Sequence, residues 1–95
     1  MQATIHGKRY DTDKATIVAH DCYFDGRDYE RHGRNVYLYR TFHGSYFALH
    51  LTQRQGELDY IEPLSVEEAR TYWEQLPGRE LEYAKAFPSV QVEDA

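Results

Sequence analysis

Short apolar and aromatic runs alternate along the chain with glycine-containing turn signals. These signals are His6-Gly7, Asp25-Gly26, His32-Gly33, His43-Gly44, Gln55-Gly56 and Pro77-Gly78. Runs of this kind between such turns predict β-strands. The first turn, between ATI and KRY, predicts an opening hairpin. Thr12 or Asp13 is expected to cap a short helical turn before a strand near residues 17–24, and residues 25–34 are expected to form an exposed loop.

The segment NVYLYRTFHGSYFALHL, residues 35–51, predicts a hairpin around His43-Gly44. A two-residue turn there pairs Phe42 with Ser45 and separates the side chains into two faces. One face is aliphatic and aromatic and holds Val36, Leu38, Phe42, Phe47, Leu49 and Leu51. The other face is rich in tyrosine and holds Tyr37, Tyr39, Thr41, Tyr46, Ala48 and His50.

A three-residue loop with a glycine bulge would shift this pairing by one residue and mix the two sets. The cleaner separation favours the two-residue turn. The aliphatic face is then expected to be core, and the tyrosine face is expected to be partly covered by the N-terminal hairpin.

The clearest local signal is PLSVEEARTYWEQLPG, residues 63–78. Ser65 and Glu68 form a capping box, and Leu64 before it can pack on the first turn. The apolar stripe of the helix is Val66, Ala69, Trp73 and Leu76, and Pro77-Gly78 ends it. Helical spacing resumes through Leu81, Ala84 and Phe87, and a short strand in ELDYIEP is expected to stop at Pro63.

These patterns predict an α+β fold, with an antiparallel sheet of about four to five strands packed against one or two C-terminal helices. At 95 residues the chain is expected to form a single domain over residues 1–95. Cys22 is the only cysteine, which excludes an internal disulfide and favours a reducing cytoplasm. The N-terminus has no apolar run typical of a signal peptide, and no stretch is long enough for a membrane helix, so no membrane partner is expected.

Charge is distributed unevenly between the two halves of the chain. Residues 1–54 carry eight Lys and Arg against six Asp and Glu, a net charge of +2, whereas residues 55–95 carry three against ten, a net of −7. An acidic half of this kind attracts basic surfaces and repels a phosphate backbone. The alternative, which is the commoner case, is that the acids only keep a small protein in solution.

Catalytic and metal-binding motifs are weak. His20-Asp21-Cys22 is the one place where a base, a carboxylate and a nucleophile are adjacent, but an extended strand points Asp21 away from the other two. The five histidines lack the HxH, HxxxH or CxxC spacing of a metal site. We therefore expect no catalytic residue, no metal and no cofactor. An enzyme that uses Cys22 or a histidine pair is the least favoured hypothesis.

Binding residues are sought instead among the tyrosines and acids. The tyrosine face with Arg40 and His50 could stack bases, but the net charge and the lack of a basic stripe oppose this, so no direct contact with nucleic acid is expected. Exposed acids can pair with Arg and Lys of a nucleic-acid-binding protein. The candidate partner-binding residues are Asp25, Asp28, Glu30, Tyr37, Tyr39, Tyr46, Glu67 and Glu74.

Three segments together resemble a group of small proteins common in phages, plasmids and integrated mobile elements. They are IHGKRYDT (5–12), LYRTFHGSYF (38–47) and IEPLSVEEARTYWE (61–74), which resemble the group's GKxYDTxTA, LYRTxxGxYFL and IxPLxxEEAxxW in the same order. Residues 50–60, HLTQRQGELDY, depart from the glycine-rich stretch usual in the group. No functional residue carries over, because the matched positions are explained as turns, caps and core: Gly7, Tyr10, Asp11, Thr12, Tyr39, Arg40, Gly44 and Trp73.

The resemblance implies a context in which small acidic proteins act against host defence, with anti-CRISPR proteins as the best-known case. The leading hypothesis is therefore a non-enzymatic inhibitor that binds a nucleic-acid-binding effector, such as a CRISPR complex, and blocks it sterically and electrostatically. The alternative is a small structural or regulatory module that self-associates, as a homodimer, through a tyrosine face or sheet edge.

Overall fold

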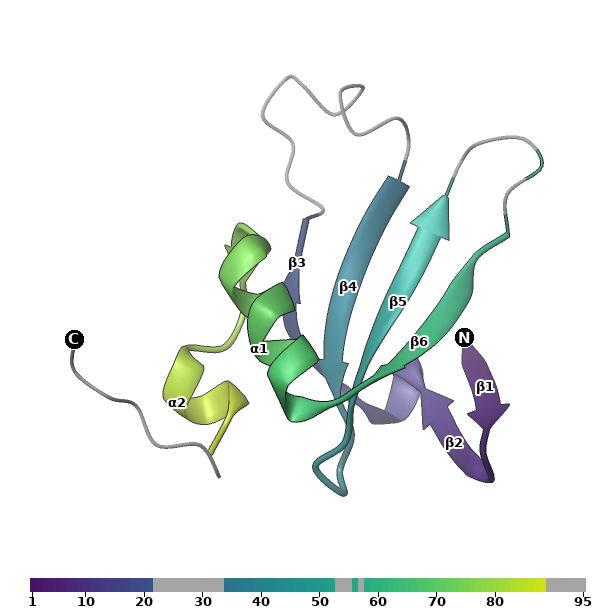
Figure 1. Cartoon of the computed structure of the whole chain (residues 1–95), viewed down its shortest axis with the longest axis horizontal. Helices are drawn as coiled ribbons and strands as arrows, with labels where there is room; N and C mark the ends of the chain where they lie inside the picture. Colours follow the sequence, from purple (N-terminus) through teal and green to yellow (C-terminus); the bar gives the residue numbers. More distant parts are fainter. Residues whose placement is uncertain (22–33, 53–55, 57, 89–95) are drawn as a thin grey trace.

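The computed structural model describes residues 1–21, 34–52, 56 and 58–88 (Figure 1). In chain order, the elements of these residues are β1 (Gln2–Ile5), β2 (Lys8–Asp11), the 3-10 helix η1 (Thr12–Lys14), β3 (Thr16–His20), β4 (Arg34–Arg40), β5 (Tyr46–Thr52), β6 (Tyr60–Leu64), α1 (Val66–Gln75), β7 (Gly78–Arg79) and α2 (Tyr83–Ala86). Five strands form an antiparallel sheet in the order β6-β5-β4-β3-β7, and β1 pairs with β2 separately. The expected α+β class is confirmed.

The sheet separates two cores (Figure 1). The helix-side core lies under α1 and α2 and consists of Val18, Ala19, Leu38, Tyr46, Ala69, Leu76, Ala86 and Phe87. The hairpin-side core lies under the β1–β2 hairpin and consists of Tyr10, Phe47, Leu49 and Ile61. The hairpin thus covers part of the second face, where Tyr37 and Tyr39 are half-buried.

The predicted register of the β4–β5 hairpin is wrong by one residue. The observed pairs are Arg40–Tyr46, Tyr39–Phe47, Leu38–Ala48, Tyr37–Leu49, Val36–His50 and Asn35–Leu51. The turn is the three-residue loop, in which the Thr41 N–H donates to the Ser45 carbonyl and Gly44 has a φ of 86°. A glycine at positive φ is what this bulged loop requires.

The shift by one residue redistributes the side chains between the faces. Tyr46 faces the helices, whereas Phe47 joins Tyr39 on the hairpin side. Phe42, expected in the core, lies in the loop and is 90% exposed. The separation of aliphatic from tyrosine-rich positions did not predict the register correctly. Both faces of this sheet are covered, so each face needs apolar side chains.

Two boundaries near the N-terminal and edge strands also differ from expectation. The cap of η1 is Asp11, whose side chain accepts a hydrogen bond from the Asp13 N–H, in place of Thr12 or Asp13. Pro63 does not stop the strand but lies within β6. An edge strand tolerates proline because one side of its backbone has no ladder to complete.

The capping box of α1 is confirmed. The Ser65 hydroxyl accepts from the Glu68 N–H at 3.1 Å, and the Glu68 carboxylate accepts from the Ser65 N–H at 3.0 Å. Ala69 and Leu76 of the predicted stripe are buried, and Leu64 packs against the same core. Local sequence is sufficient here because the cap and the apolar stripe favour the same helix.

The second predicted helix is present but shorter than its apolar spacing indicates. Only Tyr83–Ala86 is α-helical, Ala84 is exposed, and Ala86 and Phe87 are the buried residues. In the preceding segment, Gly78–Arg79 pairs with β3, and the N–H groups of Glu80 and Leu81 both donate to the Val18 carbonyl, at 2.9 and 3.1 Å. Pairing with β3 therefore overrides the local helical spacing.

Candidate interaction surface

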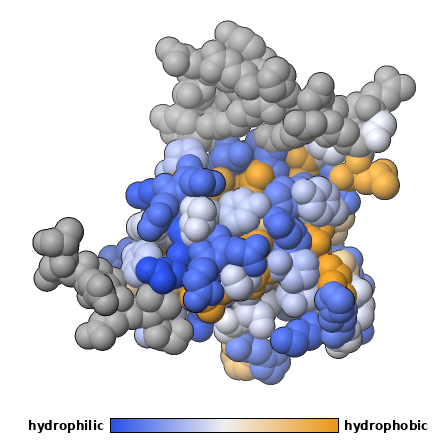
Figure 2. Space-filling view, in the orientation of Figure 1, coloured by the Kyte–Doolittle hydropathy of each residue, from blue (hydrophilic) through white to orange (hydrophobic). Residues whose placement is uncertain are grey.

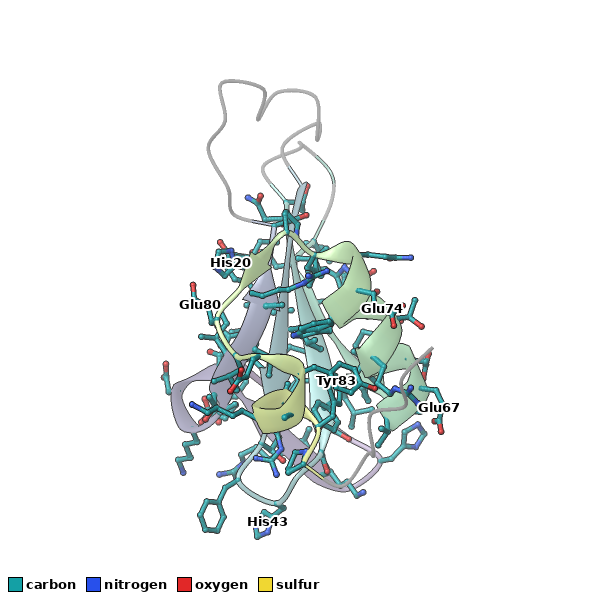
Figure 3. All side chains as sticks on the ribbon, turned by 90° about the vertical axis from the view of Figure 1, so that its left-hand side faces the viewer. His20, His43, Glu67, Glu74, Glu80 and Tyr83 are labelled. Atoms are coloured by element: carbon teal, nitrogen blue, oxygen red, sulfur yellow. The ribbon has the colours of Figure 1, made fainter. Side chains whose placement is uncertain are left out.

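Glu67 and Glu74 lie on the solvent face of α1. Both side chains are exposed, and in Figure 3 both point away from the sheet. Their spacing of seven residues places them about 10 Å apart along one face of the helix. Within the described residues, neither carboxylate forms an ion pair. Both charges are therefore available to a partner.

The three tyrosines expected as anchors do not form one surface. Tyr46 is 4% exposed, and its hydroxyl donates to the Ala86 carbonyl, so it is a core residue and not an anchor. Tyr39 stacks on Phe47 with ring centroids 5.1 Å apart. Tyr37 is half-buried on the same face. The remaining candidates, Asp25, Asp28 and Glu30, lie outside the described residues.

Four residues near the edge strand form a polar and aromatic network that sequence reasoning missed. The β5–β6 register places His50 opposite Tyr60, and the two rings stack at 4.4 Å with an interplanar angle of 10°. His50 Nε2 lies 2.9 Å from Glu62 Oε1, and the Tyr72 hydroxyl donates to the same oxygen at 2.9 Å. Glu62 thus ties the sheet to α1.

This network separates two hollows. The first, of about 490 Å³, is bordered by the apolar Val36, Leu51 and Leu58, by Tyr60, and by the polar Asn35, His50 and Thr52. Leu58 and Tyr60 are 85% and 53% exposed. The second, of about 290 Å³, is lined by Glu62, Glu68, Thr71, Tyr72 and Gln75. An apolar hollow therefore adjoins an acidic one, and Figure 2 shows hydrophobic patches between hydrophilic ones on this face.

The protonation states at the acidic hollow follow from its geometry. Burial, together with the hydrogen bond to Glu62 and its charge, raises the pKa of Tyr72 to about 12, so this phenol remains a donor at neutral pH. Hydrogen bonds from Ser65 lower the pKa of Glu68, so its carboxylate stays ionised. The hollow therefore presents negative charge beside an aromatic ring.

A basic region lies at the opposite end of the strands, at the β4–β5 turn. Lys8, Arg9, Lys14 and His43 border two adjoining hollows there, beside the exposed Phe42. His43 marks this end in Figure 3. The two carboxylates of η1 and its cap reduce the local positive charge, so this region is less strongly charged than α1.

Two of the residues considered for catalysis, His20 and Asp21, are described by the structure, and each has a different partner. His20 Nε2 lies 2.8 Å from Glu80 Oε1, and the Asp21 carboxylate accepts from the Val36 N–H at 2.7 Å, which is a backbone tie. Cys22 lies outside the described residues. Among the residues that are described, no three His, Cys, Asp or Glu side chains come together as a metal site would require.

Comparisons with known proteins do not assign the chain to a family. No protein-family model, no curated protein and no solved structure matches it. Within the described part of the chain, no helix combines the length and the apolar character needed to cross a bilayer. The surfaces described above therefore carry what can be inferred about function.

Proposed function

We propose that this chain is a non-enzymatic binding protein that docks its acidic α1 face on the basic surface of a nucleic-acid-binding protein. Bound there, it occupies the nucleic-acid site sterically and electrostatically. The proposal is carried by Glu67 and Glu74, two exposed carboxylates that form no ion pair with any residue the structure describes, on a helix that is capped and packed at both ends. Such carboxylates can pair with arginine and lysine of a partner. Because the helix is already ordered, it loses little conformational entropy on binding.

The resemblance to small phage and mobile-element proteins extends the proposal to a host-defence inhibitor that acts in the bacterial cytoplasm. A CRISPR effector complex is then the partner, because such complexes hold nucleic acid in a positively charged channel. An acidic surface competes there with the phosphate backbone.

The proposal is tested by a tagged pull-down from bacterial extracts that contain CRISPR effectors, at low and at high salt. We expect one stoichiometric, basic, nucleic-acid-binding protein that is lost at high salt, because exposed ion pairs are screened. A lane without a partner at low salt would contradict the proposal.

Two variants then test whether α1 makes the contact. Glu74→Lys and Glu67→Gln are expected to weaken binding and to reduce its salt dependence. Glu82→Lys, at an exposed carboxylate beyond α1, changes the net charge by the same amount as Glu74→Lys and serves as the control. Equal losses in Glu74→Lys and Glu82→Lys would mean that only net charge matters, and α1 would be removed from the proposal.

Self-association is a second candidate, favoured by the exposed Tyr60 on the edge strand β6. Edge strands with exposed apolar side chains are common sites of pairing between chains. Light scattering distinguishes the two candidates, since a dimer of the isolated chain that Tyr60→Ser dissociates would favour this one. A monomer at all concentrations would remove it.

A further inference from the structure

The apolar and acidic hollows meet at Glu62, and their combined chemistry defines a more specific partner. We propose that they bind one segment of a protein partner that presents an apolar side chain and an arginine as neighbours on one face. The apolar side chain enters the hollow beside Tyr60, and the arginine enters the hollow beside Tyr72. This inference rests on the proposed function and names the chemistry that the partner brings.

The apolar hollow has the features of an anchor site. Tyr60 is packed on the His50 ring through one face, so the ring is held in place while about half of the residue remains exposed. Leu58 is 85% exposed beside it. A partner's apolar side chain that covers both residues removes this surface from water, which is favourable by roughly 25 cal/mol per Å² of apolar area buried. A ring that is already held in place loses little entropy on binding.

The acidic hollow matches a guanidinium group. Oε1 of Glu62 accepts from His50 and Tyr72, and Oε1 of Glu68 accepts from Ser65. The second oxygen of each carboxylate has no hydrogen-bond partner among the described residues, and no lysine or arginine lines the hollow. Arginine offers a planar fork of donors to carboxylates and a flat face to the Tyr72 ring, whereas lysine offers a point charge.

The two hollows are close enough for neighbouring side chains of one segment. His50, which lines the first hollow, and Tyr72, which lines the second, have ring centroids 6.2 Å apart. Side chains three or four residues apart on a helix are separated by about 5–6 Å at Cβ. The site is also continuous with the exposed acids of α1, so a basic partner gains attraction over the whole surface.

The test is a ¹⁵N NMR titration of the full chain with short synthetic helical peptides. The first peptide carries one tryptophan and one arginine four residues apart, and its controls replace the arginine with glutamate or the tryptophan with serine. We expect the first peptide to shift the amide signals of Tyr60 and Tyr72 and to bind about tenfold more tightly than either control. The control without arginine loses a charge-assisted hydrogen bond, and the control without tryptophan loses apolar surface buried beside Tyr60.

Variants of the chain assign each half of the peptide to a hollow. Glu68→Gln keeps a capping-box side chain but removes a charge, and it should weaken only peptides that contain arginine. Tyr60→Ser should weaken only peptides that contain tryptophan. Glu82→Gln, at an exposed carboxylate beyond α1 and outside both hollows, is expected to leave peptide binding unchanged.

Three results would overturn the inference: equal binding of all peptides, shifts confined to the Lys8 and Arg9 end, or no effect of Glu68→Gln. Concentration-dependent shifts around Tyr60 without peptide would overturn it as well, because a second copy of the chain would then be the occupant. Failure of the pull-down with success of the peptide removes only the proposed function. Failure of the peptide with a successful pull-down removes only this inference.

Discussion

The two faces of the five-stranded sheet are covered by different elements and held in different ways. On the helix side, the hydroxyl and N–H groups of packed aromatic side chains also form hydrogen bonds. The Tyr46 hydroxyl donates to the Ala86 carbonyl while its ring stacks near Phe87 at 5.1 Å. Trp73 Nε1 donates to the Leu81 carbonyl at 3.0 Å. These hydrogen bonds connect β5 and α1 to the C-terminal segment.

On the hairpin side, the contacts between layers are those of rings and aliphatic side chains. Phe47 lies between Tyr39, stacked at 5.1 Å, and Tyr10, edge-on at 5.6 Å. The hydrogen bonds between Met1 and Thr12 close the hairpin on itself. The hairpin is therefore attached to the sheet mainly by hydrophobic burial, which is non-directional.

This difference predicts an order of opening. The helix side combines burial with directional hydrogen bonds, so its elements should open only near global unfolding. The hairpin is short and packs on a smaller core, so it should open at lower free energy. The acidic α1 face and the acidic hollow lie on the more firmly held side, whereas the apolar hollow is lined by Val36 of the helix side and Leu51 of the hairpin side.

The largest expected effects come from the two buried phenylalanines. Phe47 and Phe87 are both fully buried, and replacement of either by alanine should lower the free energy of unfolding by about 3–5 kcal/mol. Amide exchange should tell the two apart, because Phe47→Ala should increase exchange in β1 and β2, and Phe87→Ala in α2 and β7. Equal increases everywhere in both variants would mean that the two faces open as one unit.

The next effect concerns Gly78, where β7 meets β3. A Cβ there would lie 2.5 Å from His20 Cε1 and 2.9 Å from the His20 carbonyl oxygen. Gly78→Ala should therefore displace β7 and lower stability by about 1–3 kcal/mol, the usual cost of overpacking. Urea denaturation measures the loss, and Glu80→Gln, which weakens the His20 contact without a clash, should cost less.

How far the fold follows from sequence depends on whether local signals agree with tertiary ones. The α1 helix was predictable because Ser65 and Glu68 cap the same segment whose apolar stripe is buried. The β4–β5 register was not predictable. Both faces of the sheet are covered and therefore apolar, so the alternation of side chains does not select one register. In addition, a turn that contains Gly44 is compatible with either of two loop lengths. Residues 78–81 are not helical because they bond to β3, in part through the Val18 carbonyl, and no local pattern reveals this distant partner.

The candidate site was predictable only in part. Glu67 and Glu74 could be placed on the exposed face from helical periodicity alone. Tyr46 was misplaced because the register was wrong. The network around Glu62 requires the β5–β6 pairing and the approach of Tyr72 from α1, so it depends on three elements whose relative positions no single motif specifies.

A smaller effect is expected at the N-cap of α1. Ser65→Ala removes the acceptor for the Glu68 N–H and should lower stability by about 1 kcal/mol, with faster amide exchange confined to the first turn of α1. Ser45→Ala, in the β4–β5 turn, is the matched control and should change stability less. A larger loss of stability for Ser45→Ala would show that the β4–β5 turn contributes more to stability than the α1 cap does.

The last prediction compares one tyrosine from each face. The pKa of Tyr39 is raised by burial and by the charge of Asp13, and that of Tyr72 is raised to about 12 by burial and by Glu62. A raised phenol pKa means that the folded chain holds the proton more tightly than the unfolded chain, whose phenols titrate near 10. For Tyr72, the linked stability is thus fully present below about pH 10 and is lost as the pH rises through about 12.

The difference between the absorbance titrations of the wild type and of Tyr72→Phe should show the Tyr72 phenol titrating at about pH 12. Glu62→Gln should lower the pKa only part of the way, because burial is the larger cause. Asp13→Asn should likewise lower the pKa of Tyr39 only in part. If Glu62→Gln returned Tyr72 to its ordinary pKa, the carboxylate and not burial would dominate, and the acidic hollow would be more open to water than its packing on α1 implies.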